Sequence, residues 1–149
     1  DMTRLTLDSI AIAGFGYRFN SFERNELDSF LVALGDALGE SLNSITRMPF
    51  QKPFARLAEA RFDQAIAEMN AKVDGIIAER RADPDPDAND LLNLMLTAVD
   101  PETGERLDDI NIRYQVLTFL IAGHETTSGM LTFAFSYLLR NPAILAQAY

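Results

Sequence analysis

The sequence contains no cysteine, no tryptophan and a single histidine. Without cysteine, the chain itself supplies no disulfide, no thiolate ligand for a metal and no cysteine nucleophile. Basic residues are also scarce, because 13 Lys and Arg stand against 22 Asp and Glu, giving a formal net charge of -9. Nucleic-acid phosphates require a basic footprint. We therefore expect no nucleic-acid partner and no binding to anionic membrane surfaces, and the acidity suits a cytoplasmic protein kept in solution by its charge.

The beginning of the chain also lacks a targeting segment. Its first residues, Asp-Met-Thr, do not start a basic stretch followed by an apolar one, so no signal peptide is predicted. The 149 residues, 48% of them hydrophobic, are enough for one domain with a core. Both ends fall within helix-like sequence, and we expect an interior fragment of a longer protein.

Apolar residues recur at spacings of three and four, which predicts an all-α chain without paired strands. The first predicted helix runs from Met2 to Ala13, and the second starts at Asp28 with the apolar face Phe30, Leu31, Leu34, Leu38, Leu42 and Ile45. A third has the apolar face Phe62, Ile66, Met69, Val73, Ile76 and Ile77, and a short fourth, capped by Asn89 or Asp90, buries Leu91, Leu92, Met95, Leu96 and Val99. The longest helix runs from Asp108 or Asp109 to about Arg140, and Pro142 opens the last one. The linker DPDPDAND begins like a calcium-binding loop, but Ala88 and Leu94 replace the required Gly and Glu. We expect no metal ligands within the chain.

The longest predicted helix has a polar interruption, FLIAGHETTSG, from Phe119 to Gly129. Between Tyr114 and Leu139 the only formally charged residue is Glu125. A helix that is apolar nearly all round is either buried or spans a membrane. Its length permits a span, but a central acidic residue costs roughly 2.5–3.5 kcal/mol on insertion. A buried core helix is therefore favoured over a membrane span.

Small and hydroxyl-bearing side chains share one face of this interruption. Ala122 and Thr126 are four residues apart, and the bare backbone of Gly123 lies beside them. This predicts a shallow groove that a flat group can approach closely. The Thr126 hydroxyl is expected to bond back to the Ala122 carbonyl, and a water or ligand that takes over this carbonyl would kink the helix. Glu125 lies about 100° further round the helix, where it either feeds protons through water or is a structural anion paired with a basic group.

Spacing alone leaves simpler interpretations open. Hydroxyl residues in a buried helix are often bonded only to the backbone. A lone histidine such as His124 is often a satisfied core residue. Ser128 stands where a zinc protease motif H-E-x-x-H needs its second histidine, so that class is excluded.

The segment AGHETTSG, from Ala122 to Gly129, resembles the oxygen-binding motif of the haem-thiolate monooxygenases, the cytochromes P-450. Two further segments, GFGYRFNSF (Gly14 to Phe22) and DPETGERLDDINIRYQ (Asp100 to Gln115), resemble the bacterial self-sufficient fatty-acid hydroxylases, in which a flavin reductase is fused to the haem domain. The resemblance covers residues 1–149. It implies part of the cytochrome P-450 fold, with helices E to I and the start of helix J.

The resemblance also implies roles for individual residues. Thr126 and Glu125 would be catalytic, Thr126 by holding dioxygen and a water at the haem and Glu125 as part of the proton route. Haem contacts would be made by Phe119, Ala122, Gly123 and Thr126. The substrate pocket would be lined by Leu38, Leu42, Ile45, Thr118, Ile121 and Ala122. The loop from Arg47 to Phe54 would form the lip of the substrate channel.

The implied parent enzyme inserts one atom of dioxygen into fatty acids or similar long-chain substrates. Its cofactor would be haem b, with electrons from NADPH passing through FMN and FAD of a reductase. The cysteine thiolate that drives O–O cleavage, and the family's Glu-x-x-Arg pair, are absent and expected beyond Tyr149. We therefore expect the chain to be inactive by itself. A non-catalytic helical interaction module is the alternative.

Overall fold

The computed structural model describes residues 1–47 and 55–148. Every regular element in this part of the chain is an α-helix, which confirms the all-α prediction. The helices are α1 (Met2–Phe15), α2 (Ser29–Thr46), α3 (Arg56–Ala82), α4 (Leu91–Thr97), α5 (Asp109–Arg140) and α6 (Pro142–Ala148). Apart from Arg47, the predicted channel lip lies outside the described residues.

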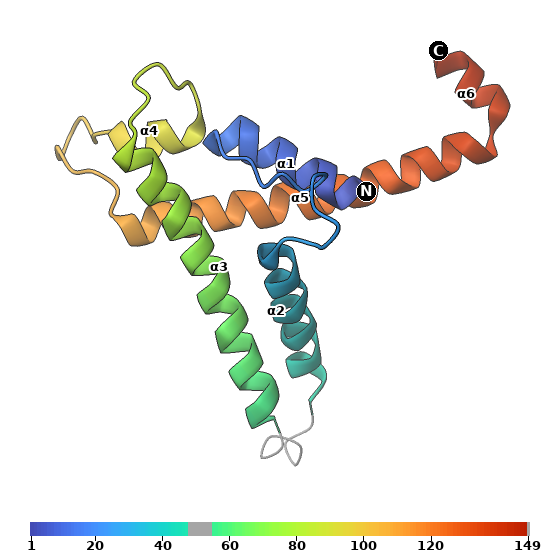
Figure 1. Ribbon diagram of the computed structural model, residues 1–149, viewed down its shortest axis with the longest axis horizontal. Helices are drawn as coiled ribbons and strands as arrows, with labels where there is room; N and C mark the ends of the chain where they lie inside the picture. The colour runs from blue at the N-terminus through green and yellow to red at the C-terminus, as the bar shows by residue number, and fades with distance from the viewer. Residues whose placement is uncertain (48–54, 149) are drawn as a thin grey trace.

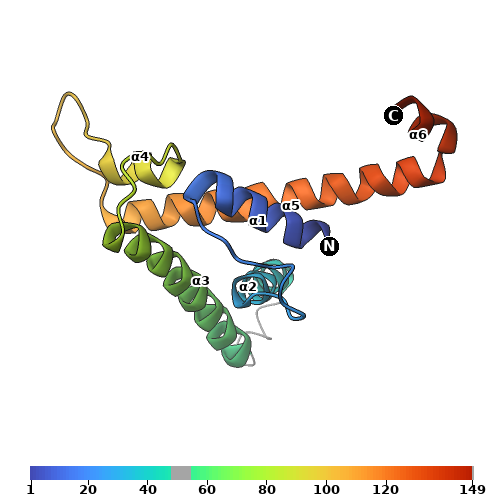
Figure 2. The ribbon, with the colours of Figure 1, turned by 45° about the horizontal axis from the view of Figure 1, so that its top comes forward.

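The long helix α5 organises the arrangement (Figure 1). In both views α1 lies alongside the middle of α5, and α2 and α3 extend away from α5 towards the lower part of the picture (Figures 1 and 2). The C-terminal part of α5 extends beyond α1 towards α6. Among the helices of residues 1–47 and 55–148, none combines the length and apolar character that a membrane crossing requires.

Aspartates begin three of the helices. The side chains of Asp28, Asp90 and Asp108 accept hydrogen bonds from the second or third N–H of α2, α4 and α5, at 2.9, 2.8 and 2.7 Å respectively. Each such cap satisfies an N–H that the helix cannot bond internally and contributes about 1 kcal/mol. Of the caps left open by the sequence, Asp90 and Asp108 are the ones used.

The first helix ends two residues later than predicted, at Phe15. Gly16 terminates it in the left-handed conformation, with φ at 61°, which a residue without a side chain adopts at no steric cost. Arg80 of α3 donates to the Phe15 carbonyl at 3.0 Å and forms a bidentate ion pair with Asp90. This cluster ties the ends of α1 and α3 to the start of α4.

The core lies where α1, α2, α3 and α5 meet. Its largest fully buried side chains are Phe15, Phe19, Phe30, Leu7, Leu92, Ile112, Leu120, Val73 and Val116. The predicted face of α3 is confirmed, because Met69, Val73, Ile76 and Ile77 are buried. The predicted burial of Val99 is wrong: α4 ends at Thr97, and Val99 is exposed in the loop that follows.

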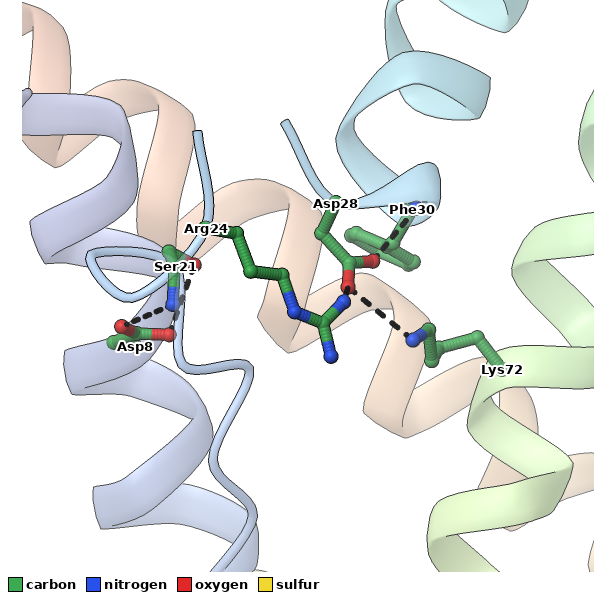
Figure 3. A network of polar contacts seen from close by, with 6 residues as sticks. All are labelled: Asp8, Ser21, Arg24, Asp28, Phe30 and Lys72. Atoms are coloured by element: carbon green, nitrogen blue, oxygen red, sulfur yellow. Dashed lines mark hydrogen bonds and ion pairs between the residues drawn. The ribbon is translucent and has the colours of Figure 1, made fainter. Parts of the chain in front are cut away.

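The loop between α1 and α2 is fastened to α1 by polar contacts. The Asp8 carboxylate accepts from both the N–H and the hydroxyl of Ser21, each at 3.0 Å (Figure 3). The Arg4 guanidinium donates to the carbonyls of Arg24 and Asn25 at 3.1 and 2.8 Å. These bonds fix the direction in which the chain enters α2.

A buried carboxylate joins α2 to α3. Asp28 is only 4% exposed and, besides capping α2 at Phe30, accepts from Arg24 at 3.2 Å and from Lys72 of α3 at 3.3 Å (Figure 3). The Lys72 ammonium also lies 5.5 Å from the centre of the Phe19 ring. The start of α2 is therefore held to the middle of α3 by charge as well as by packing.

Candidate functional site

The polar interruption of α5 has a buried side and an open side. Ile112, Val116, Leu120, His124 and Ser128, each four residues apart, form the buried stripe. His124 is 2% exposed, and its Nδ1 lies 2.8 Å from the Leu120 carbonyl oxygen. His124 is therefore a satisfied core residue.

Thr126 stands on the opposite side, exposed, about 200° round the helix from His124. Its hydroxyl donates to the Ala122 carbonyl at 2.6 Å, which confirms the predicted back-bond. Ala122 is also exposed, and Phe119, one turn back, is 41% exposed. The open side thus presents an aromatic ring, a methyl group and a hydroxyl in a row.

Gly123 has a role that the sequence did not indicate. A methyl group added there would stand 3.1 Å from Cγ1 of Ile10, so the absence of a side chain lets α1 approach α5 closely. Gly123 therefore points to α1 rather than to the open side shared by Ala122 and Thr126. The haem contact expected of Gly123 stays a prediction.

A cleft of about 450 Å³ lies next to the interruption, between α1, α2 and α5. Leu31, Leu34 and Leu38 of α2 line one wall. The α5 wall is formed by His124, Glu125, Ser128 and Gly129, so the cleft adjoins the packed side of α5 and Thr126 is not part of its lining. The structure thus brings together Leu38 and Glu125, which are far apart in sequence. Leu31 and Leu34 were recognised only as part of an apolar face, because their place in a cleft depends on how the helices pack.

The remaining predicted substrate residues lie elsewhere. Leu42 and Ile45 are 67% and 80% exposed, on the part of α2 beyond the cleft, and they do not line it. Their apolar stripe continues past the end of the packed core. Thr118 is exposed and bonds back to the Tyr114 carbonyl at 2.7 Å, while Ile121 packs against the core. Substrate contacts by these four residues stay predictions.

Glu125 is exposed, and no ion pair within residues 1–47 and 55–148 involves it. The interpretation of Glu125 as a paired structural anion therefore has no support among the described residues. Arg4 shares the cleft with it, but its guanidinium donates to loop carbonyls. Glu125 is left as a free carboxylate at the edge of an apolar cleft.

The described residues thus form part of a helical domain organised along one long helix, which exposes the Ala122–Thr126 side. A family profile for cytochrome P-450 matches residues 1–149. The chain belongs to the cytochrome P-450 family.

Known relatives match over the whole chain. It is 50% identical over 149 residues to a bifunctional cytochrome P-450/NADPH–P-450 reductase of Bacillus cereus, covering 100% of this chain and 14% of the relative. It is 53% identical over 148 residues to a protein of the same description from Bacillus subtilis, covering 99% and 14%. The crystal structure of a mutant cytochrome P-450 haem domain superimposes with a TM-score of 0.86 at 55% identity, covering 100% of this chain and 31% of that one. The chain thus spans about one seventh of the curated relatives' length.

Family membership implies haem, and the fused reductases of the relatives imply FMN, FAD and NADPH in such a reductase domain. The open side of α5 fits one wall of a haem site: Ala122 is small, Phe119 offers a flat apolar ring, and Thr126 offers a hydroxyl. The chain does not supply the side of a haem site that carries the iron ligand. There is no cysteine, and the His124 ring is buried on the opposite side of α5.

Proposed function

We propose that residues 1–149 form the distal, oxygen-activating part of a monooxygenase haem domain. The full-length enzyme would insert one atom of dioxygen into a fatty acid or similar long-chain molecule and reduce the other to water. One observation carries this proposal: Ala122 and Thr126 lie together on the exposed side of α5, joined by the hydroxyl-to-carbonyl bond, in a chain that matches the family throughout.

The chemistry assigned to this chain is the delivery of protons. When bound, haem with a thiolate ligand supplies oxygen activation. The Thr126 hydroxyl is a donor and an acceptor, and exchange of its bond to the Ala122 carbonyl for a water would place a proton on the open side. Glu125, exposed and unpaired among the described residues, would pass protons from solvent through water to Thr126.

The substrate class is supported by the lining of the cleft. Three leucines of α2 give one wall on which an alkyl chain can lie. Electrons would come from NADPH through a flavin reductase, as the relatives' names indicate. We propose that the enzyme is cytoplasmic, as suits the acidity of this chain.

The first test uses the full-length protein. Reduction under carbon monoxide should give the red-shifted Soret band of a thiolate-ligated haem. A complete protein without that band, or one whose remaining sequence lacks a ligating cysteine, would be the helical interaction module instead.

The second test removes the Thr126 hydroxyl. Thr126→Ala should lower product formed per NADPH and raise peroxide release, because the proton donor is lost. Thr132→Ala is the matched control: Thr132 makes the same back-bond on α5, to the Ser128 carbonyl at 2.7 Å, but lies six residues beyond Thr126 and outside the segment from Ala122 to Gly129. Equal coupling in both variants would refute the assigned proton route.

The third test concerns the cleft. Leu38→Ala should weaken fatty-acid binding about tenfold, as loss of a few buried methylene-sized contacts does. Ile45→Ala should change it less than about twofold, since Ile45 does not line the cleft. Titration of the substrate-induced spectral shift measures both. A larger effect at Ile45 would place the substrate elsewhere on α2.

A further inference from the structure

The hydroxyl of Thr6 reaches from α1 to the backbone of α5. Thr6 is buried, and its Oγ1 lies 2.9 Å from the carbonyl oxygen of His124, 118 residues away in the chain. Two carbonyls of its own helix, those of Met2 and Thr3, lie at 3.0 and 3.3 Å. A hydroxyl carries one proton, so these three carbonyls compete for it, and of the three only the His124 carbonyl joins α1 to another helix.

The acceptor lies inside the polar interruption. Thr126 bonds to the Ala122 carbonyl at 2.6 Å, Ser128 to the Glu125 carbonyl at 2.9 Å, and Thr6 to the His124 carbonyl. Side chains therefore bond to carbonyls throughout this stretch, and such bonds weaken the backbone ladder and favour a bend. Only the bond from Thr6 comes from another helix.

The contact with α1 supports the interruption from behind. Ile10, one turn from Thr6, occupies the space that a side chain at Gly123 would need, and its neighbours Leu7 and Ala11 on α1 are 0% exposed. Thr126 stands on the far side of α5 from this contact. Movement of residues 122–126 towards the open side would have to stretch the bond between Thr6 and the His124 carbonyl.

We infer that Thr6 is a positioning residue: its hydrogen bond to the His124 carbonyl limits how far residues 122–126 bend, and so sets where the Thr126 hydroxyl stands. This inference rests on the function proposed above. Thr6 lies on the core side of α5 and acts through the backbone.

The experiment compares Thr6→Val, which keeps the shape and removes the donor, with Thr6→Ser, which keeps the donor. Both are made in the full-length protein. Ser9→Ala, the loss of an exposed hydroxyl on the same helix, is the control. Product and hydrogen peroxide are counted per NADPH, because each NADPH oxidised without product reduces one dioxygen to hydrogen peroxide.

Thr6→Val should raise peroxide per NADPH about two- to tenfold, the range that corresponds to one lost hydrogen bond. Thr6→Ser and Ser9→Ala should stay within about twofold of the unmutated protein. A second measurement is independent of turnover: amide hydrogen exchange of the peptide spanning residues 120–130 should be faster by a similar factor in Thr6→Val only.

Unchanged coupling and exchange in Thr6→Val would overturn the inference. So would equal changes in Thr6→Val and Thr6→Ser, since packing rather than the donor would then be responsible. Thr6→Ala is measured in parallel. If Thr6→Val does not fold, the coupling and exchange of Thr6→Ala are compared with those of Thr6→Ser instead. Absence of the thiolate-type band from the unmutated protein would instead sink the proposed function, and the inference with it.

Discussion

Replacement of Asp28 by alanine should destabilise the haem domain by about 2.5–5 kcal/mol. The carboxylate caps α2 through the N–H of Phe30, and loss of such a cap costs about 1 kcal/mol. The Asp28 carboxylate also accepts a charged hydrogen bond from Lys72, whose side chain is 24% exposed. Because the Asp28 side chain is buried, this bond should contribute about 1.5–3 kcal/mol. The bond from Arg24, 57% exposed, adds about 0–1 kcal/mol because water screens it.

Chemical denaturation of the full-length protein, followed by the helical circular dichroism, measures the loss. Asp28→Asn separates the contributions, because the amide oxygen still caps α2 while the charge is gone. Lys72→Met removes the buried partner and keeps the apolar stem over Phe19. Arg24→Gln is the control for the exposed pair and should cost less than about 1 kcal/mol.

The order of the effects decides the outcome. Asp28→Ala should be the most destabilising, with Asp28→Asn and Lys72→Met between it and Arg24→Gln. A double variant of Asp28→Asn with Lys72→Met should lose less than the two single losses combined, since both remove the same pair. Full additivity, or a loss in Asp28→Ala below about 0.5 kcal/mol, would refute the assignment of Asp28 as the anchor between α2 and α3.

Two further predictions concern the cluster where α1, α3 and α4 meet. Burial raises the pKa of Asp90, but hydrogen bonds from Arg80 and from the start of α4 outweigh it, so the net pKa lies below its ordinary value of 3.8. A carboxylate with a lowered pKa stabilises the folded state at pH values above its unfolded pKa, and this contribution is lost as the pH falls through the folded pKa. In denaturant titrations from about pH 5 to pH 3, the unmutated protein should therefore lose more stability than Asp90→Asn. Parallel curves of stability against pH would contradict this. Gly16→Ala should lower the free energy of unfolding by more than about 1 kcal/mol, because φ is 61° and the added methyl would overlap the Arg80 guanidinium. Gly14→Ala, whose methyl meets nothing within 4 Å, should instead stabilise by about 0.5–1 kcal/mol, and equal thermal shifts for the two glycines would refute the distinction.

Local interactions made much of the fold predictable. The caps at Asp90 and Asp108 depend on an N–H three residues ahead, and the bond from Thr126 to Ala122 depends on a carbonyl four residues back. These contacts form within one helical turn, so the sequence contains both partners. The end of α1 was misjudged by two residues because Gly14 continues the helix and Gly16 ends it.

Contacts between helices were not predictable in the same way. The spacing predicts one apolar face from Leu31 to Ile45, but packing ends partway along it, so Leu38 enters the cleft and Ile45 does not. A stripe reports that a face is apolar without identifying what covers it. The contact of Gly123 with Ile10 and the bond of Thr6 to His124 join residues more than 100 positions apart. Only the packed chain shows them.

The packed side of α5 fixes the orientation of the helix, and the open side carries the residues assigned to the site. On the packed side, the stripe from Ile112 to Ser128 and the close contact with α1 fix the rotation of the helix about its own axis. Since successive residues are about 100° apart, that rotation also determines where Ala122 and Thr126 stand on the open side. Polar residues are tolerated on the packed side of the interruption because the His124 Nδ1 and the Ser128 hydroxyl find backbone carbonyls, those of Leu120 and Glu125. The hydroxyl assigned to proton delivery is therefore oriented by contacts on the packed side. Substitutions between α1 and α5 such as Thr6→Val should alter coupling although Thr6 does not line the cleft.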